Sequence, residues 1–432
     1  MKVLWLSHFV PWPATGMGML QRSHHLLRQV ASDHEVHLVA LNDPALLEPD
    51  QLPAARAALA GHCAAVDIVR RDGGGARGTR ALALTRAMLT ARPYDAAWMT
   101  SAALRRRLRA LARERRFDLV HVDSVGLAPN ARRFTAPVVQ NHHNVESAML
   151  RRRADAEPSR WRRALFRHEA AKLARLERRS ARRTALHLTV SEVDGRRLRQ
   201  IVGDGAIRVV PNGVDTAWFA PQRPLGHGDG GLVFAGALDW YPNREAMRFF
   251  TREVWPLLAH DAPERRLAIV GRSAPPDLQQ LAGARGITLP GFVEDVRPWL
   301  DDASIYVCPI RDGGGTRLKV LDAMAMAKPI VATTLAVEGL ALEEGVHYLR
   351  ADAPAEWLRQ VRRLEADGEL RRRMAAANRA LALERFDWRS IGRELAAAYR
   401  DALNCETRVP APDRGRRPAT PRCPDATRAG AG

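Results

Sequence analysis

The chain contains little cysteine and no long apolar run. Only four of its 432 residues are cysteine, and they stand far apart without the spacing of a metal site: Cys63, Cys308, Cys405 and Cys423. This pattern predicts a reducing compartment and argues against a disulfide-built scaffold. No stretch of about 18 apolar residues occurs, so we expect no transmembrane helix. The apolar part of the N-terminus is too short for a signal peptide and is typical of a first buried strand, which predicts a cytoplasmic protein.

Two signatures of cofactor and metal chemistry are also missing from the sequence. No Asp-x-Asp motif occurs, and no histidine, cysteine or carboxylate cluster has metal-ligand spacing, so we expect no metal site and no cofactor. No Gly-x-Gly-x-x-Gly follows the first strand, which makes a dinucleotide oxidoreductase a weak alternative.

The chain carries an excess of positive charge, nearly all of it on arginine. Lysine and arginine together number 67 against 48 acidic residues, which gives a net charge of +19. Such a charge favours anionic partners, namely diphosphates, anionic lipid surfaces or nucleic acid. The length suffices for two domains with cores of their own, and a hydrophobic content of 46% is typical of a globular protein.

Strand and helix signals alternate along the first half of the chain. This alternation predicts an α/β domain with a parallel sheet and helices on both faces. We expect strands at 3–9, 36–41, 119–122, 137–140, 187–191 and 207–212, helices at 20–30, 151–183 with a break near Pro158, and 192–201, and an exposed loop at 73–78.

The second half repeats this scheme. We expect strands at 232–235, 267–270, 287–289, 305–308 and 330–332, and helices at 244–258, 276–284, 296–301, 318–326, 358–365, 370–384 and 391–403. The domains predicted from these patterns are an N-terminal domain at 1–211, a linker at 212–231, a C-terminal domain at 232–387, a last helix at 388–404 and a tail at 405–432. The tail is rich in Pro, Arg, Thr and Gly, a composition that predicts disorder.

The most informative segment runs from Pro309 to Thr333 and predicts a glycine loop, a helix and a strand. Glycines 313–315 let the backbone approach a ligand closely, and the first free N–H groups of the helix form an anion site. Arg317 and Lys319 place cations in the first turn, where they are unfavourable unless an anion lies there. The segment therefore predicts a phosphate or diphosphate site, and we expect Asp322 to reach a ribose hydroxyl.

This segment resembles the donor-site motif of the retaining GT-B glycosyltransferases of family four, in which two Glu flank seven residues. Asp322 takes the second Glu position and Gly314 the first, and Asp312 is our candidate for the missing carboxylate. The resemblance covers roughly residues 2–403 and extends to an exopolysaccharide sugar transferase branch. It implies two Rossmann-like domains that face a cleft, with the last helix crossing back to the first domain.

Three further stretches are similar to the family. The resemblance implies that His143, in a His-Asn-Val-Glu run after a strand, lines the donor-sugar pocket. The loop with Gly16 and Gly18, followed by Arg22, matches a diphosphate loop only in part, so an ordinary βα turn remains open. Residues 209–216 match an interdomain signature that forms a turn.

The base and the diphosphate have candidates in the second domain. Pro290 to Val296 resembles a base-binding loop, in which Phe292 and Val293 would flank the nucleobase. Ala237 stands where relatives have an arginine for the diphosphate, which makes Arg272 another candidate.

The resemblance implies a metal-independent, retaining hexosyltransferase. The second domain would bind a nucleoside-diphosphate sugar, first of all a UDP-sugar, and the first domain a glycan or lipid-linked acceptor, in exopolysaccharide or other cell-surface polysaccharide synthesis. The expected catalytic residues are His143, Arg317 and Lys319, and the expected donor-binding residues are Gly18, Arg22, Arg272, Phe292, Val293, Asp312, Gly314, Gly315, Thr316, Leu318 and Asp322.

The arginine-rich stretch 151–183 suggests either an anionic membrane surface as partner, at the inner face of the membrane, or a solvated helix face. Trp161, Leu165, Leu173 and Leu176 would form its apolar stripe. Two other functions remain open: a GT-B nucleotide-sugar epimerase or hydrolase, and a basic nucleic-acid-binding protein. The second lacks interleaved aromatic residues and any known binding motif, so no nucleic-acid partner is expected.

Overall fold

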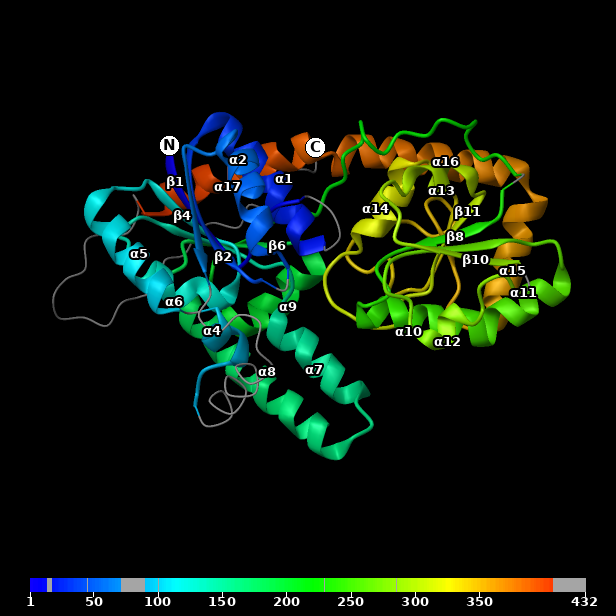
Figure 1. The fold of residues 1–432 in the computed structure, drawn as a ribbon, viewed down its shortest axis with the longest axis horizontal. Helices are drawn as coiled ribbons and strands as arrows, with labels where there is room; N and C mark the ends of the chain where they lie inside the picture. The colour runs from blue at the N-terminus through cyan, green and yellow to red at the C-terminus, as the bar shows by residue number, and fades with distance from the viewer. Residues whose placement is uncertain are drawn as a thin grey trace. The chain divides into compact units, whose positions relative to one another are not determined.

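The computed structural model describes residues 1–13, 18–44, 46–70, 90–99, 101–228, 230–284 and 286–406. The chain folds into two compact units (Figure 1). Unit 1 comprises Met1–Pro211 together with the chain from Gly392 onward, and unit 2 comprises Asn212–Ile391. Gly16, the predicted loop at 73–78 and all of the predicted tail beyond residue 406 lie outside the described residues.

Unit 1 is built on a parallel sheet with the strand order β3-β2-β1-β4-β5-β6-β7. The strands are β1 (Lys2–Ser7), β2 (Glu35–Asn42), β3 (Ala65–Arg70), β4 (Leu119–Val122), β5 (Val138–Asn141), β6 (Leu186–Thr189) and β7 (Ile207–Val209). The central strands β1, β4 and β5 are almost fully buried because helices cover both faces of the sheet. β3 was not predicted, since Asp67 interrupts its apolar run and its residues are only half-buried at the sheet edge.

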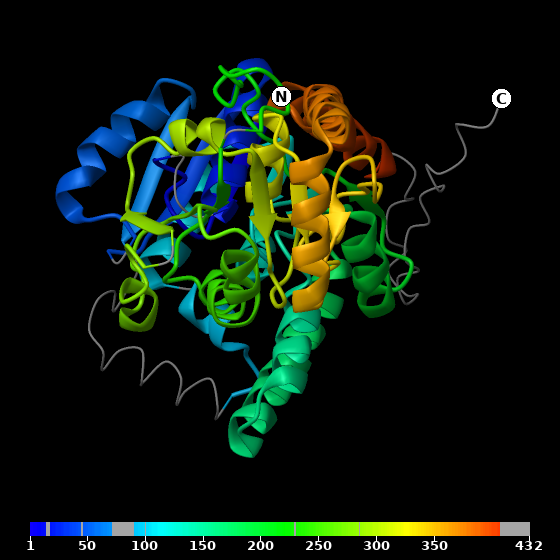
Figure 2. The ribbon, with the colours of Figure 1, turned by 90° about the vertical axis from the view of Figure 1, so that its right-hand side faces the viewer.

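The helices of unit 1 connect these strands. They are α1 (Gly18–Asp33), α2 (Leu52–Ala60), α4 (Tyr94–Trp98), α5 (Ala102–Glu114), α6 (Ala128–Ala131), α7 (Glu146–Ala156), α8 (Arg160–Ala181) and α9 (Glu192–Val202), with 3-10 turns at Pro49–Gln51 and Val125–Leu127. The predicted break near Pro158 separates α7 from α8. The two helices project beyond the sheet as a helical hairpin (Figures 1 and 2).

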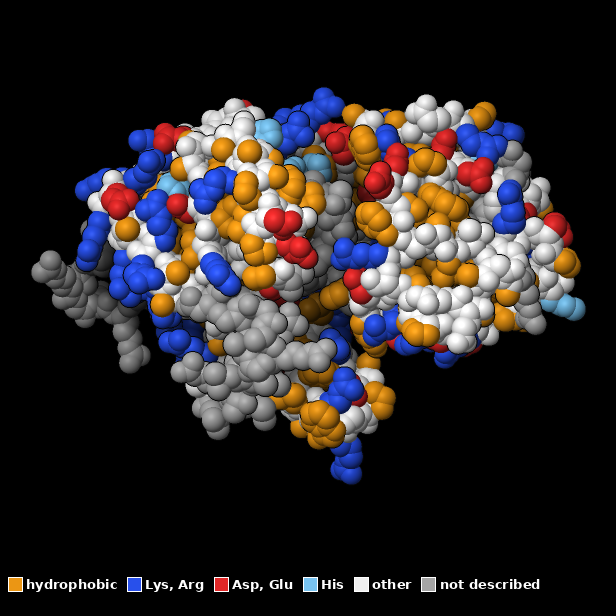
Figure 3. Space-filling model, in the orientation of Figure 1, with side chains coloured by type: hydrophobic (Ala, Val, Ile, Leu, Met, Phe, Trp, Pro, Cys, Tyr) orange, Lys and Arg blue, Asp and Glu red, His pale blue; other side chains and the backbone are white. Residues whose placement is uncertain are grey.

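The predicted apolar stripe of this stretch is wrong at its first member. Trp161 is 70% exposed, whereas Leu173 is buried. The far end of α8 packs on unit 1, but its first turn extends past the sheet, where no element of the described residues buries the indole. Figure 3 shows basic and apolar side chains together at this tip.

Unit 2 repeats the architecture with a six-stranded parallel sheet in the order β10-β9-β8-β11-β12-β13. The strands are β8 (Leu232–Ala235), β9 (Leu267–Val270), β10 (Ile287–Gly291), β11 (Ile305–Cys308), β12 (Ile330–Ala332) and β13 (Leu349–Arg350). The helices are α10 (Tyr241–Phe249), a π-helical turn (Phe250–Val254), α11 (Trp255–Asp261), α12 (Pro276–Gln279), α13 (Arg297–Asp302), α14 (Leu318–Ala325), α15 (Pro354–Ala366) and α16 (Gly368–Leu381), followed by a second π-helical turn (Ala382–Phe386). In Figure 1, α13 and α14 lie on one face of the sheet, and α10 and α12 on the other.

Two predicted boundaries in unit 2 need correction. The expected helix at 276–284 ends at Gln279, and the chain continues in turns up to Gly283, which has a φ of 79°. The expected linker is not a free segment, because Asn212 and Val214 are buried and group with unit 2. The Val214 N–H donates to the carbonyl of Phe386 at 2.7 Å.

The last helix, α17 (Trp388–Glu406), ends two residues beyond the predicted boundary. From Gly392 onward it belongs to unit 1, where a Cβ added at Gly392 would lie 2.7 Å from the Cβ of Gln29. The buried hydroxyl of Tyr399 lies 2.8 Å from Nδ1 of His121 on β4. The C-terminal helix is therefore an integral part of the N-terminal unit.

Candidate active site

The glycine loop of unit 2 joins the end of β11 to the start of α14. Gly313 and Gly315 have φ values of 109° and 65°, which disfavour any residue with a side chain. The carboxylate of Asp312 accepts the N–H of Gly313 at 2.6 Å. Asp312 therefore stabilises the loop through one carboxylate oxygen, and its role as a donor-binding carboxylate stays a prediction.

Arg317 also folds back onto this loop. Its Nη1 donates to the carbonyls of Gly314, at 2.5 Å, and Gly315, and the residue is buried. Thr316, next to it, accepts a hydrogen bond of 2.8 Å from Nδ2 of Asn212. These contacts give Arg317 a structural role in the loop in addition to the positive charge that it adds there.

Unlike Arg317, Lys319 does not bind the carbonyls of the glycine loop. Its ammonium donates to Oδ1 of Asn243, which follows β8, and lies 4.7 Å from the centroid of the Phe234 ring. Among the ion pairs of the described residues, none joins Lys319 to a carboxylate. A Cβ added at Gly236 would lie 2.5 Å from its Nζ, so a glycine is needed there to leave room for the ammonium.

The electrostatics of this cluster follow from burial. Burial lowers the pKa of Lys319 to about 8, and Arg317 lowers it further, whereas Cys308 and Asp322 raise it. Burial also raises the pKa of Asp322 to about 7, while Lys319 acts in the opposite direction. A half-buried ammonium beside a glycine loop and a helix N-terminus is an arrangement that an anion would stabilise.

The other predicted donor residues make contacts of their own. Arg272 pairs with Asp239, with Nε 3.1 Å from Oδ2. Phe292 is 71% exposed, and Val293 packs against the core of unit 2. Leu318 is the first residue of α14. Nothing in the sequence indicated the hydrogen bond between Lys319 and Asn243.

In unit 1, polar side chains gather where β1, β4 and β5 end. Asp123 is fully buried; its Oδ1 accepts Nδ2 of Asn141 at 2.7 Å and its Oδ2 accepts the hydroxyl of Ser23. Nε2 of His143 lies 3.1 Å from both the main-chain oxygen and Oδ1 of Asp123. Although burial acts to raise it, the pKa of Asp123 lies well below its usual range because His143 and His121 stabilise the carboxylate.

Arg22 points into unit 1 and binds the chain's own oxygens. Its guanidinium donates to the carbonyls of Pro211 at 2.6 Å and Val210 at 2.8 Å, and to Oδ1 of Asn141 at 3.1 Å. Burial lowers its pKa to about 10. Arg22 thus joins α1 to the end of β7, and its predicted contact with a diphosphate stays a prediction. Gly18 is the first residue of that helix.

The fold brings together three side chains of the types that bind metal ions, which the sequence did not indicate. His8, Asp123 and His143 offer ligand atoms that all lie within 4.8 Å of one another. The sequence could not reveal this group, because its members are far apart along the chain and meet only at the carboxyl ends of neighbouring strands.

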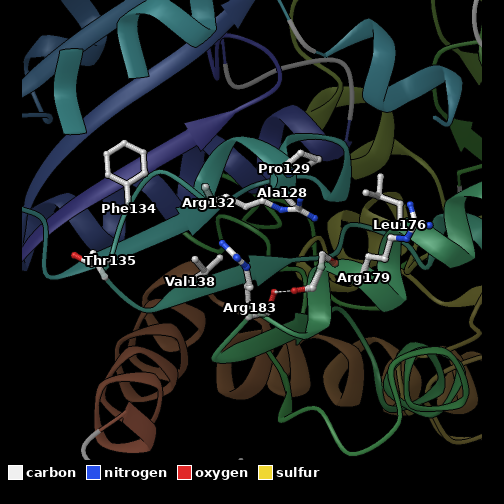
Figure 4. A pocket seen from close by; sticks show the side chains of 13 residues that line it. Ala128, Pro129, Arg132, Phe134, Thr135, Val138, Leu176, Arg179 and Arg183 are labelled. Carbon is white, nitrogen blue, oxygen red and sulfur yellow. Dashed lines mark hydrogen bonds between the residues drawn. The ribbon is translucent and has the colours of Figure 1, made fainter. Parts of the chain in front are cut away.

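A separate pocket of about 260 Å³ lies where β5 begins, at the opposite edge of the same sheet. Its lining includes Phe134, Leu176 and three arginines, Arg132, Arg179 and Arg183 (Figure 4). None of the predicted site residues lines it.

Comparison with known proteins assigns these features to a family. A model described as Glycosyltransferase Family 4 matches residues 18–218, and one described as Glycosyl transferases group 1 matches residues 229–367. The chain is a glycosyltransferase of family 4. The boundary between the two matches falls close to the junction of the two units.

Relatives of this glycosyltransferase agree with the assignment. A GDP-mannose:cellobiosyl-diphosphopolyprenol alpha-mannosyltransferase of Xanthomonas oryzae pv. oryzae is 27% identical over 241 residues, which cover 53% of this chain and 61% of that relative. Sucrose-phosphate synthase of Thermosynechococcus elongatus superposes with a TM-score of 0.67 at 16% identity, over 94% of this chain and 100% of that one. HepE of Anabaena, solved with UDP, gives 0.62 at 16% identity, over 93% and 100%. These structures establish the GT-B fold.

The described part of this glycosyltransferase contains no helix that combines the length and the apolar character needed to span a bilayer.

Proposed function

We propose that the protein transfers a hexose, with retention of configuration, from a nucleoside-diphosphate sugar to a glycan or lipid-linked acceptor. A UDP-sugar is the donor we expect first, and the pathway we expect is exopolysaccharide or other cell-surface polysaccharide synthesis in the cytoplasm. The mannosyltransferase from Xanthomonas supports a lipid-diphosphate acceptor, and HepE with UDP supports a nucleotide donor.

The observation that carries this proposal is the environment of Lys319. Its ammonium is half-buried, lacks a carboxylate partner among the described residues and lies beside a glycine loop and the N-terminus of α14. A cation that has lost part of its hydration without gaining an anion is unfavourable, and a diphosphate would supply two negative groups at that point. In this proposal Asp322, one turn further along α14, accepts a ribose hydroxyl.

The chemistry we propose needs no nucleophile from the protein. The bond between the anomeric carbon and the phosphate oxygen breaks, and the leaving diphosphate takes both electrons. The acceptor oxygen forms the new bond on the same face, and its proton passes to the departing phosphate. Lys319 and the first N–H groups of α14 stabilise the charge that develops on the diphosphate. No metal takes part in this scheme.

The α7–α8 hairpin supports a membrane-associated acceptor. Its tip carries the exposed Trp161 among arginines, and tryptophan and arginine together favour the interface of an anionic membrane. We therefore propose peripheral attachment of unit 1 to the inner face of the membrane.

A screen of nucleotide sugars tests the proposal. The full chain is incubated with UDP-glucose, UDP-galactose, UDP-N-acetylglucosamine or GDP-mannose and a detergent extract of polyprenyl-diphosphate saccharides. We expect nucleotide release that depends on the extract, and an axial anomeric bond in the product by NMR. Release that is independent of any acceptor would instead support a hydrolase, and an inverted product would refute retention.

A further inference from the structure

The pocket at the start of β5 combines apolar side chains with cations. Its largest apolar side chains are the half-buried Phe134 and Leu176. Three exposed arginines also line it: Arg132 directly after α6, Arg179 in the last turn of α8 and Arg183 just after that helix (Figure 4). No aspartate or glutamate is among the described residues of the lining. Two segments that lie far apart in the sequence thus bring three cations to one cavity.

The guanidinium groups of these arginines have no partner within the part of the chain that the structure describes. Neither a hydrogen bond nor an ion pair joins any of them to another described residue. The last turn of α8 does not need them, because the Ser180 hydroxyl donates to the carbonyl of Glu177 at 2.8 Å and the Thr184 hydroxyl donates to that of Ser180 at 3.0 Å. Their N–H groups are therefore available to a ligand.

Arginines also line a cavity of about 330 Å³ in unit 2, but these have partners. Nη2 of Arg265 donates to Glu365 at 2.7 Å. Nε of Arg371 donates to the carbonyl of Gly226 at 3.2 Å. Glu264 and Glu365 belong to the lining as well, so positive and negative charges compensate each other there. The described lining of the pocket in unit 1 offers no such compensation.

We propose that the pocket of unit 1 binds the phosphate group of a small organic phosphate. A guanidinium group matches phosphate oxygens through two parallel hydrogen bonds, and an anion offsets the mutual repulsion of three cations around one cavity. The organic part of the ligand lies on Phe134 and Leu176. Ligand pockets usually have volumes of about 300–1,000 Å³, so a pocket of about 260 Å³ suits a compact monophosphate better than a nucleotide sugar. This second site does not depend on the proposed transfer reaction.

The position of the pocket along α8 favours a soluble phosphate over the headgroup of a membrane lipid. The proposed membrane contact includes Trp161, near the start of that helix. Arg179 lies eighteen residues further along, which is ~27 Å at a rise of about 1.5 Å per residue. A headgroup bound at the tip of the hairpin therefore does not reach the pocket.

The first measurement compares inorganic phosphate with phenyl phosphate. Each is titrated into the full chain by calorimetry, in a buffer without phosphate or sulfate. We expect both to bind, and phenyl phosphate to bind about tenfold more tightly, because roughly 55 Å² of buried apolar surface is worth a factor of ten. Leu176→Ala should reduce this preference and leave the affinity for inorganic phosphate unchanged. Equal affinities of the wild type for the two phosphates would contradict an organic ligand.

Substitution of the arginines tests the charged part of the site. Arg132→Gln, Arg179→Gln and Arg183→Gln should each weaken the binding of both phosphates about tenfold, since each removes a charge-assisted contact. The matched controls are Arg175→Gln and Arg182→Gln, which replace exposed arginines of the same stretch that do not line the pocket. We expect the controls to bind both phosphates as the wild type does.

Three results would overturn the inference. The first is no binding of either phosphate at millimolar concentration. The second is an equal loss of affinity in the control variants, which would indicate a general effect of charge. The third is binding to phosphatidate vesicles that the pocket variants abolish, without binding of phenyl phosphate, which would identify a lipid headgroup as the ligand.

Binding of UDP is measured in parallel on the same proteins. We expect equal affinity for UDP in the wild type and in all pocket variants, because Lys319 and the glycine loop belong to unit 2. Saturating UDP should also leave the affinity for phenyl phosphate unchanged. Failure of the wild type to bind UDP would refute the donor assignment alone, whereas competition between UDP and phenyl phosphate would contradict a separate site in unit 1.

Discussion

The hydroxyl of Tyr399 on α17 lies 2.8 Å from Nδ1 of His121 on β4, and both side chains are fully buried. The His121 ring also stacks on Trp5, with centroids 3.7 Å apart, and its Nε2 lies 3.8 Å from Oδ1 of Asp123. This contact joins the C-terminal helix to the strand that carries Asp123, and it is one reason why α17 belongs to unit 1.

Tyr399→Phe should therefore destabilise unit 1. The substitution removes a buried hydrogen bond and leaves an imidazole nitrogen without its partner, so we expect a loss of about 1–3 kcal/mol in the free energy of unfolding. Urea unfolding followed by near-UV circular dichroism measures it. A change below about 0.5 kcal/mol would show that the contact contributes little. Arg400→Ala, at the next residue of α17 and exposed to solvent, serves as the control.

Binding of UDP should depend on pH in a bell shape. Lys319, with a pKa of about 8, loses its charge as the pH rises through that value, so affinity falls on the alkaline side. Asp322, with a pKa of about 7, is protonated below that value and then accepts a ribose hydroxyl less well, so affinity falls on the acidic side.

Two substitutions separate the limbs of this profile. Lys319→Arg should abolish the alkaline limb, because arginine stays charged, and Asp322→Asn should abolish the acidic one. Calorimetric titrations of UDP between pH 6 and about 9 give the comparison. If the affinity for UDP still falls on both the acidic and the alkaline side in these variants, the titrating groups belong to the ligand or to other residues.

Gly236→Ala should weaken UDP binding without unfolding the protein. The added Cβ would lie 2.5 Å from Nζ of Lys319, and the flexible end of that side chain can move away. The ammonium would then leave its place beside Asn243, and we expect a loss of affinity of about 10-fold, with a loss of stability no larger than that of the control. Gly203→Ala, where nothing lies within 4 Å but φ is positive, is the control for backbone strain. Unchanged UDP affinity in Gly236→Ala would contradict the assigned position of Lys319.

The α7–α8 hairpin should bind anionic vesicles through its arginines. Replacing five arginines of this hairpin with glutamine should reduce binding to phosphatidylglycerol vesicles, and added salt should weaken the wild-type interaction. The five positions are Arg151, Arg152, Arg153, Arg162 and Arg163. A matched variant replaces five exposed arginines of unit 2, namely Arg359, Arg363, Arg372, Arg373 and Arg385. Equal loss in both variants would indicate a nonspecific charge effect.

The sequence predicted the fold well where apolar runs are strong. Strands such as Leu232–Ala235 and Ile305–Cys308 have the predicted bounds, because parallel strands covered on both faces are continuous apolar segments. β3 was not predicted from the sequence. It is a half-buried edge strand, and Asp67 interrupts its apolar residues.

The candidate site was predictable only where its chemistry is local. Glycines 313–315 and Lys319 are close in sequence, so their role could be inferred from spacing. The contacts of Arg22 with Val210 and Pro211 could not be inferred, because these partners lie nearly 190 residues away. His8 and Asp123 gave no signal, since their proximity depends on the order of the strands.

Lys319→Ala tests the central claim most directly, with UDP affinity measured by calorimetry and sugar transfer measured with the donor found in the screen. Loss of one charge-assisted contact is worth about 1.5–3 kcal/mol, so we predict UDP binding weaker by about 10- to 150-fold and a comparable loss of kcat/KM. Arg359→Ala, an exposed cation on α15, should behave as wild type. Wild-type affinity and turnover in Lys319→Ala would contradict the placement of the donor diphosphate in unit 2.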